Sequence, residues 1–213
     1  MTAYARHPKK IFSQAGFTLV ELLMALVVAA LAMSAILVAS MGQHHSYNTQ
    51  LQIADARQKA RSVIAMLRSD LLMATSFNIA TAQHIQLVEV DNNGANTTID
   101  YNLNGAALMR GQGADAATAG AAQVVFAEDI DGLEFYFPKG VMQLNNIPIV
   151  TISLVTRAGA PDPRFQDRDI YKTKSGQPWQ QPGMANANAN QPLNDNFHRR
   201  FWQETVVCRN MAQ

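Results

Sequence analysis

An apolar run close to the N-terminus constrains this chain more than any other feature. Residues 17–41 read FTLVELLMALVVAALAMSAILVASM, interrupted by Thr18, Glu21, Ser34 and Ser40. A helix rises about 1.5 Å per residue, so the run spans roughly 37 Å and can cross a hydrocarbon core about 30 Å thick. We therefore expect a membrane-spanning helix.

The charges around the run predict its orientation. Arg6, Lys9 and Lys10 precede it without any acidic residue, and the next basic residue after it is Arg57. Positive charge on the cytoplasmic side is the usual arrangement, so we expect a cytoplasmic N-terminus and a remainder outside the cytoplasm. A secretory signal peptide has a shorter apolar region, of about 7–15 residues. A plain single-span anchor leaves Glu21 unexplained.

Composition excludes several classes of function. The chain has 213 residues and a formal net charge of +1, whereas a dedicated nucleic-acid binder normally carries a basic face. Its single cysteine, Cys208, excludes an intramolecular disulfide and a multi-cysteine zinc site. No Ser-His-Asp, Cys-His or paired-carboxylate set has the spacing of a catalytic site. We therefore expect no enzyme activity, cofactor, metal or nucleic-acid partner.

Glu21 is the unusual residue of the apolar run. A carboxylate inside such a segment costs a few kcal/mol and is normally kept for function. Gly16 directly precedes Phe17, and cleavage between them would create an α-amine four residues before Glu21. A spacing of i to i+4 places both groups on one helix face, where an ion pair would lower the cost of burying them. The same pairing between adjacent helices would fix their axial register.

The segment Gly16-Phe17-Thr18-Leu19-Val20-Glu21 follows a short basic leader and precedes a long apolar helix. In this it resembles the processing site of type IV prepilins and of type II secretion pseudopilins. The resemblance implies that residues 1–16 are a leader removed after Gly16 by a prepilin peptidase, which also N-methylates Phe17. It further implies that Glu21 meets the amine of a neighbouring subunit during filament assembly.

The apolar run continues into an amphipathic segment. Ala60, Ile64, Leu67 and Leu71 follow i, i+4, i+7, i+11 spacing, with Val63 beside them. We expect one helix from about Phe17 to about Ser76, with residues 17–41 in the membrane or filament core and residues 42–77 as its amphipathic continuation.

Residues 78–213 predict a periplasmic, β-rich head. Apolar and polar residues alternate on both sides of a turn at 91–94, which predicts a hairpin. We expect further strands near 124–126, 133–137 and 150–154 and after Arg199. We expect residues 111–122 to be a flexible loop and residues 158–196 a long exposed loop. The fold class is α+β, a long N-terminal helix packed on an antiparallel sheet in the lollipop arrangement of pilins.

Three C-terminal segments narrow the resemblance. Residues 129–135, residues 150–157, and residues 199–200 together with 206–210 are similar to the PilW family of minor pilins, and the pseudopilin J family has a similar layout. The first likeness implies a low-copy subunit that primes pilus assembly in the inner membrane and ends at the tip, with links to twitching motility and adhesion. Its expected partners are other minor pilins, the major pilin, the platform protein and a tip adhesin. The alternatives are a pseudopilin J-like subunit and a membrane-anchored periplasmic binding module that does not polymerise.

Acidic residues in two segments of the head suggest two interpretations. Asp129 and Asp131 precede a strand and fit a turn, with calcium binding as the alternative. Asp162, Asp167 and Asp169 lie among basic residues, which favours a solvated loop with balanced charge over a calcium site.

Other polar residues have plain structural interpretations. His44 and His45 follow the apolar run and are expected at the membrane interface rather than at a metal. Cys208 is expected to be a buried thiol in the last strand, with an intersubunit disulfide as the alternative. Arg199 and Arg200 are expected on the surface, where they could also contact an anionic partner.

Overall fold

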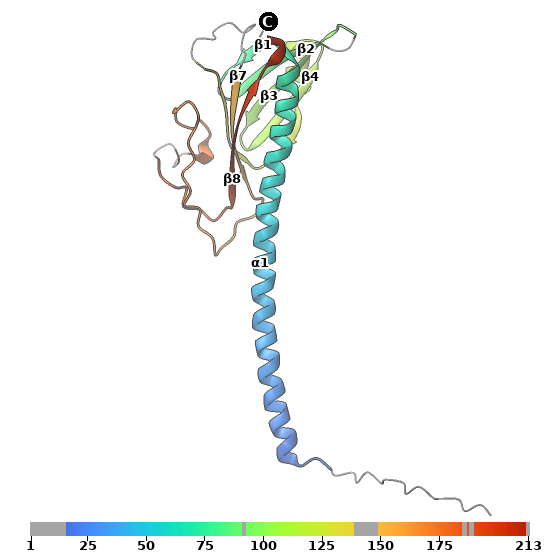
Figure 1. The fold of residues 1–213 in the computed structure, drawn as a ribbon, viewed down its shortest axis with the longest axis vertical. Coiled ribbons are helices and arrows are strands. Elements are labelled where there is room, and N and C mark those ends of the chain that lie inside the picture. Colours follow the sequence, from blue (N-terminus) through green and yellow to red (C-terminus); the bar gives the residue numbers. More distant parts are fainter. Residues whose placement is uncertain (1–15, 91–92, 139–148, 185–186, 188–189, 212–213) are drawn as a thin grey trace, which may run out of the picture. The chain divides into compact units, whose positions relative to one another are not determined.

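The computed structural model describes residues 16–90, 93–138, 149–184, 187 and 190–211. The expected leader, except Gly16, and part of the predicted turn at 91–94 lie outside this range. The chain forms two compact units, Met1–Tyr47 and Asn48–Gln213, and the boundary between them falls within the first helix. Figure 1 gives the course of the chain and the labels used below.

The first helix, α1, is 55 residues long and comprises Leu19–Met73. It continues without a break through Gly42. The predicted stripe is confirmed, because the side chains of Ala60, Val63, Leu67 and Leu71 are completely buried. The helix ends three residues before the expected Ser76, because the next strand begins at once and inserts Ala74 and Phe77 into the core.

Five antiparallel strands follow the helix in one sheet, in the order β1-β2-β3-β4-β5. The bounds are Ala74–Ala80 (β1), His84–Val90 (β2), Asn96–Asn104 (β3), Ala107–Gly113 (β4) and Val124–Ala127 (β5). The predicted hairpin is confirmed by β2 and β3, in which Ile85 pairs with Tyr101 and Leu87 with Ile99. All four side chains are buried, so the alternation of the sequence marks the face turned to the core.

A second antiparallel sheet has the order β6-β7-β8. Its strands are Ile130–Tyr136, Ile149–Arg157 and Arg199–Val207, which confirms the strands expected in these regions. Phe135 of the edge strand β6 donates a backbone hydrogen bond of 2.8 Å to Ala82, in the turn between β1 and β2. This bond ties the two sheets together at the edge of β6.

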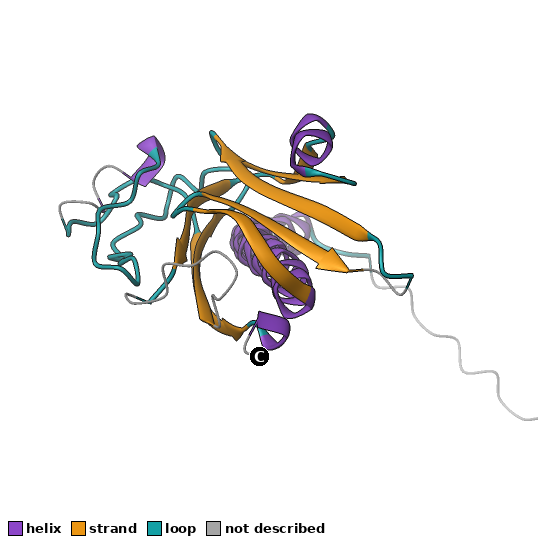
Figure 2. Ribbon diagram, turned by 90° about the horizontal axis from the view of Figure 1, so that it is seen from above, coloured by secondary structure: helices purple, strands orange, loops and turns teal. Residues whose placement is uncertain are grey.

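One hydrophobic core joins the amphipathic half of α1 to both sheets. It contains Leu67 and Leu71 from α1, Leu87 from β2, Phe135 from β6 and Ile152 from β7. Figure 2 shows the strands curving around the helix, which is seen nearly end-on. A helix and sheets that each bury one face make an α+β fold, as expected from the sequence.

The predicted flexible loop at 111–122 is wrong. Residues 111–113 end β4, and a short helix, α2, spans Ala116–Ala121 behind a capping box between Asp115 and Thr118. A Cβ atom at Gly111 would overlap the carbonyl oxygen of Ala119. Gly111 thus allows α2 to lie directly on β4, so this glycine serves close packing rather than flexibility.

The segment 158–196 is irregular, as expected, but it is not simply an exposed loop. Its aromatic and aliphatic side chains form a second small core with Val155 of β7, made of Tyr171, Trp179, Met184, Ala187 and Leu193. The described residues also form two short 3-10 helices, Pro182–Met184 within this segment and Arg209–Met211 after β8.

Candidate functional site

The apolar segment of α1 is the first candidate site, because nothing within the described chain covers it. Leu26, Leu31 and Ile36 are each more than 60% exposed, and the other large apolar side chains from Leu19 to Met41 are similarly bare. Among the described helices, α1 is the one long and apolar enough to cross a membrane. A helix that is apolar on all faces requires lipid or other apolar helices around it.

The predicted cleavage site lies just before this helix. Gly16, Phe17 and Thr18 are not helical, and the Phe17 side chain is 86% exposed. A Cβ atom added at Gly16 would meet no atom within 4 Å. The Gly16–Phe17 peptide bond is therefore accessible, and the chain's own fold does not demand glycine at this position.

Glu21 lies in the first turn of α1, and its carboxylate contacts Thr18. The backbone N–H and the hydroxyl of Thr18 each donate to Oε2 of Glu21 over 3.3 Å. The backbone N–H of Glu21 donates in return to the Thr18 hydroxyl over 3.2 Å. This reciprocal arrangement is a capping box at the start of the helix.

The helix start corrects one part of the sequence argument. We expected Phe17 and Glu21 to share a helix face, but α1 begins at Leu19, so Phe17 precedes the helix in the uncut chain. Thr18 was not among the predicted functional residues, although Thr-x-x-Glu ahead of an apolar run is a recognisable signal for a capped helix N-terminus.

A buried ion-pair cluster in the head corrects the prediction that Arg199 is a surface charge. Its side chain is 2% exposed and forms ion pairs with Asp131, Asp167 and Asp195 at 2.5–2.9 Å. Burial would lower the pKa of the Arg199 guanidinium, but the contacts with Asp195, Asp131 and Asp167 outweigh it and raise that pKa. Arg200, in contrast, is exposed as expected.

Two of the three aspartates that were predicted to be solvated in segment 158–196 are buried, Asp162 and Asp167. Asp169 is exposed, as predicted. The carboxylate of Asp162 accepts a hydrogen bond from Thr49 of α1 at 3.0 Å and lies 3.2 Å from His198. The two buried aspartates therefore fasten the segment to α1 and to β8.

Asp129 and Asp131 stand at the start of β6 and meet basic side chains. Asp129 accepts from Lys59 at 2.8 Å, and Asp131 pairs with both Arg157 and Arg199. Among the described residues, no three His, Cys, Asp or Glu side chains are placed to hold a metal ion.

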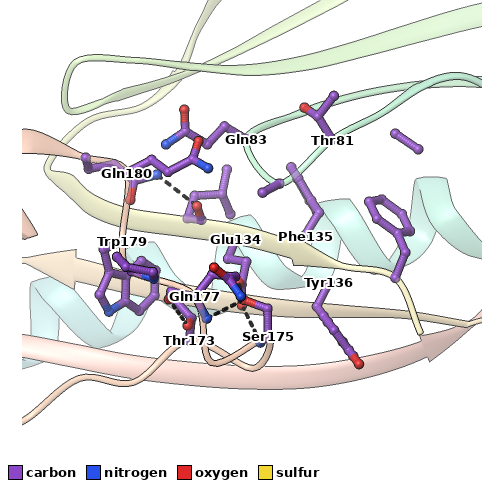
Figure 3. Close-up of a pocket in the computed structure, with 16 residues that line it drawn as sticks. Thr81, Gln83, Glu134, Phe135, Tyr136, Thr173, Ser175, Gln177, Trp179 and Gln180 are labelled. Carbon is purple, nitrogen blue, oxygen red and sulfur yellow. Dashed lines mark hydrogen bonds between the residues drawn. The ribbon is translucent and has the colours of Figure 1, made fainter. Parts of the chain in front are cut away.

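A pocket of about 220 Å³ lies at the outer edge of β6, between residues 80–83 and residues 173–181. Figure 3 shows its lining, with Phe135, Trp179 and several polar side chains. Glu134 is the acidic residue of this lining, and its carboxylate accepts the backbone N–H of Lys174 at 2.7 Å. That carboxylate also accepts the Ser175 hydroxyl, so it fixes the loop rather than offering a free charge to a ligand.

Cys208 is buried directly after β8, as expected for a free thiol. Burial raises the pKa of the thiol to about 11. A protonated, inaccessible thiol is a poor nucleophile, which argues for a packing role in the folded head.

The comparisons with known proteins point to the N-terminal segment. Residues 11–37 match the model of the prokaryotic N-terminal methylation motif, and this range contains Gly16, Phe17 and Glu21. A type IV-like pilin from Thermus thermophilus is similar in structure, with a TM-score of 0.48 and 13% identity over 74% of this chain and 97% of that one. No curated protein matches the sequence.

A long helix with an apolar N-terminal half, followed by antiparallel sheets that cover its amphipathic half, defines an α+β fold. The N-terminal methylation motif adds the processing signal to this fold. The chain is accordingly an α+β protein that carries the prokaryotic N-terminal methylation motif. The motif and the apolar helix together fit a single-pass anchor in the inner membrane.

Proposed function

We propose that this chain is a minor pilin of a type IV pilus, similar to the PilW family, which primes filament assembly in the inner membrane and stays at or near the tip. The observation that carries the proposal is the bare apolar half of α1, which bears one carboxylate in its first turn and directly follows an accessible Gly16–Phe17 bond. A permanent membrane anchor needs the apolar helix but neither the acid nor the cleavable bond.

The physical logic couples extraction from the membrane to assembly. An apolar helix leaves the bilayer without a large cost only when other apolar helices replace the lipid around it. Removal of residues 1–16 creates an ammonium group on Phe17, which can pair with Glu21 of a neighbouring subunit and so compensate its charge. Phe17 precedes α1 in the uncut chain, so we expect the amine that cleavage would create on Phe17 to lie outside the helix, where it can reach a neighbour.

The proposed partners follow from this pathway. Prepilin peptidase would cut after Gly16 and methylate Phe17, and the platform protein would deliver the subunit into a complex with other minor pilins and the major pilin. A tip adhesin is the further partner that the proposed position allows. The head supports a minor rather than a major subunit, because the single cysteine is buried and cannot provide a C-terminal disulfide.

Mass spectrometry of the mature N-terminus tests the processing step. We expect a chain that begins with methylated Phe17, whereas an intact Met1 or a start at Met41 would contradict the proposal. Gly16→Val should leave the head folded, since the added side chain meets open space in the uncut chain. It should block cleavage, because it changes the residue directly before the proposed cut. Gly42→Val is the matched control, because a Cβ atom added at this glycine would also meet no atom within 4 Å and the position lies far from the cut.

Identifying the fibre that contains the mature chain distinguishes the minor pilin from the two alternative functions. Recovery of the chain in sheared surface pili supports the minor pilin. Recovery solely with a secretion pseudopilus would favour the pseudopilin J-like alternative, and a processed chain in neither fibre would favour the non-polymerising binding module.

A further inference from the structure

The pocket at the outer edge of β6 is built by segments that are far apart in the sequence. Residues 80–83, residues 133–137 and residues 173–181 all contribute to its lining (Figure 3). Its volume of about 220 Å³ is below the roughly 300–1,000 Å³ of pockets that hold drug-sized ligands. The pocket therefore admits one ring-sized group rather than a long ligand.

The charges of the lining disfavour an ionic ligand. Among the described residues, Glu134 is the one that brings a formal charge to the lining. Its carboxylate is buried and already accepts the Ser175 hydroxyl and the backbone N–H of Lys174, the latter at 2.7 Å. This charge repels an anion, and its donors satisfy it without a cation. The ligand that fits is therefore uncharged.

Glutamine side chains supply amide groups to the lining. The pocket is lined by Gln83, Gln177, Gln180 and Gln181. Gln83 and Gln180 lie on the same side of β6 in Figure 3, although they come from different parts of the chain. An amide offers two N–H donors and one carbonyl acceptor, so it can bind two neighbouring hydroxyl groups at once. Adjacent hydroxyls of a sugar ring present this pattern, since each of them both donates and accepts.

Gln181 adds a buried acceptor to this set. The side chain is 5% exposed, and its Nε2 donates to the carbonyl of Leu133 at 2.8 Å. That bond fixes the orientation of the amide, because a reversed amide would bring two oxygens together. The Oε1 atom of Gln181 has no donor within the described part of the chain, and a buried acceptor of this kind is costly. A hydroxyl in the pocket would supply the donor once the lining shifts to uncover this oxygen.

The outer edge of β6 is closed to the addition of a peptide strand. The backbone N–H of Phe135 donates to Ala82 at 2.8 Å, and the carbonyl of Leu133 accepts from Gln181. A peptide that extends a sheet needs such backbone groups of the edge strand to be free. A ligand of this pocket is therefore bound through side chains. The ring of Phe137, which also lines the pocket, offers apolar surface to the C–H groups of a sugar.

We infer that this pocket binds one uncharged sugar ring of hexose size. The size admits a single ring, the charge excludes an ionic ligand, and the amides match neighbouring hydroxyls. The inference goes beyond the proposed function and does not depend on it, because the pocket lies wholly within the Asn48–Gln213 unit.

Saturation-transfer NMR of the full chain in micelles tests binding. The detergent must have no sugar headgroup, because such a headgroup would compete for the pocket. The probes are the methyl glycosides of glucose, galactose and mannose, and the corresponding uronate glycosides are the anionic controls. We expect at least one neutral glycoside to bind with half-saturation at about 1–10 mM, the range for a ligand of this size, and its uronate to bind at least about fivefold more weakly. The inference is overturned if no neutral glycoside binds saturably up to about 50 mM, or if the uronate binds equally well.

The fluorescence of Trp179 tests where the sugar binds. Trp179 lines the pocket, and Trp202 is the second of the two tryptophans in the chain. In Trp202→Phe the emission therefore comes from Trp179 alone. We expect the sugar to shift this emission with the half-saturation that NMR gives for the wild-type chain. Binding that leaves the emission of Trp179 unchanged would place the sugar elsewhere and overturn the inference.

A pair of double variants tests the role of the amides. Gln83→Ala with Gln180→Ala removes two amides from the lining and should weaken sugar binding about tenfold, as expected for two hydrogen bonds. Gln50→Ala with Gln112→Ala removes two exposed glutamines that do not line the pocket, and should leave binding within about twofold. Urea unfolding should be the same for both double variants, which separates lost binding from lost folding. Equal sugar affinity of the two variants would overturn the inference.

An uncharged peptide tests the alternative ligand. A capped tetrapeptide of glycine and glutamine offers amide donors and acceptors without a sugar ring, and we expect it to bind at least about fivefold more weakly than the best glycoside. Tighter binding of the peptide would overturn the assignment to a sugar. None of these measurements requires cleavage after Gly16 or a fibre, so a failure here is distinguishable from a failure of the proposed function.

Discussion

The two halves of α1 have the same backbone and opposite surroundings. In the half from Leu19 to Met41 the apolar side chains point in all directions and are exposed. Between Ala56 and Leu71 one stripe is buried in the core of the head, and arginines such as Arg61 and Arg68 occupy the exposed faces. A helix can thus have apolar residues on all faces or in a single stripe. The stripe is buried by the chain's own sheets, whereas a helix that is apolar on all faces needs apolar partners from outside the chain.

This difference predicts which property a substitution changes in each half. Substitutions in the head should alter the unfolding free energy of the chain, whereas substitutions in the apolar half should alter assembly and leave the head stable. Both tryptophans, Trp179 and Trp202, belong to the Asn48–Gln213 unit, so their fluorescence reports unfolding of the head in detergent solution.

Loss of Arg199 should have the largest effect on the head. Arg199→Ala leaves the carboxylates of Asp131 and Asp167 buried without their shared guanidinium, which should lower the unfolding free energy by about 3–5 kcal/mol. Arg200→Ala, at the adjacent exposed position, should change it by less than about 0.5 kcal/mol. Urea unfolding followed by tryptophan fluorescence measures both, and equal values would refute the buried cluster.

The same substitution in each half of α1 gives the most direct contrast. Leu67→Ala opens a cavity at a completely buried position and should cost about 3 kcal/mol in urea unfolding of the head. Leu31→Ala, at a side chain that is 66% exposed, should leave the unfolding of the head unchanged. Destabilisation of the head by Leu31→Ala would break the distinction between the two halves.

Gly111→Ala tests packing between two elements of the head. The added methyl group meets the carbonyl oxygen of Ala119, so α2 must shift away from β4 at a cost of about 1–3 kcal/mol. Gly120→Ala is the matched control, because the nearest atom to its added methyl group lies at 3.5 Å, an ordinary contact distance. Gly105→Ala would be a poor control, because the φ angle of Gly105 is positive. Urea unfolding should therefore distinguish Gly111→Ala from Gly120→Ala.

The last prediction concerns the dependence of stability on pH. Burial raises the pKa of Glu89 from 4.5 to about 7, and the nearby Asp70 adds to the rise. The folded head therefore holds a proton that the unfolded chain releases, so this group's contribution to stability falls as pH rises from about 4.5 to 7. Glu89→Gln should flatten this slope in urea unfolding, whereas Glu128→Gln, at a position outside the buried core, should not.

The sequence was sufficient for features that depend on local periodicity. The i, i+4, i+7, i+11 stripe and the alternation in β2 and β3 predicted which side chains face the core, because a helix and a strand repeat with fixed periods. The Thr18–Glu21 box is equally local, and its spacing is visible in the sequence.

Features that depend on distant neighbours could not be predicted in this way. Arg199 is charged and was expected on the surface, but Asp131 and Asp167 come from other parts of the chain and make its burial possible. Gly111 led to the prediction of a flexible loop. Its packing role could not be predicted, because its close contact with α2 exists only after β4 and α2 have folded together. The candidate assembly segment was easier to predict, since its processing motif and apolar pattern are continuous in sequence.

The central claim is that the apolar half of α1 is covered by other subunits after cleavage, and that Glu21 is compensated there. The most direct measurement compares wild-type chain with Glu21→Gln in sheared surface pili, each normalised to the amount of processed chain in the membrane. The account predicts wild-type chain with methylated Phe17 in the pili, and a loss of at least tenfold for Glu21→Gln despite normal processing. Equal incorporation of the two chains, or wild-type chain confined to the membrane, would contradict it.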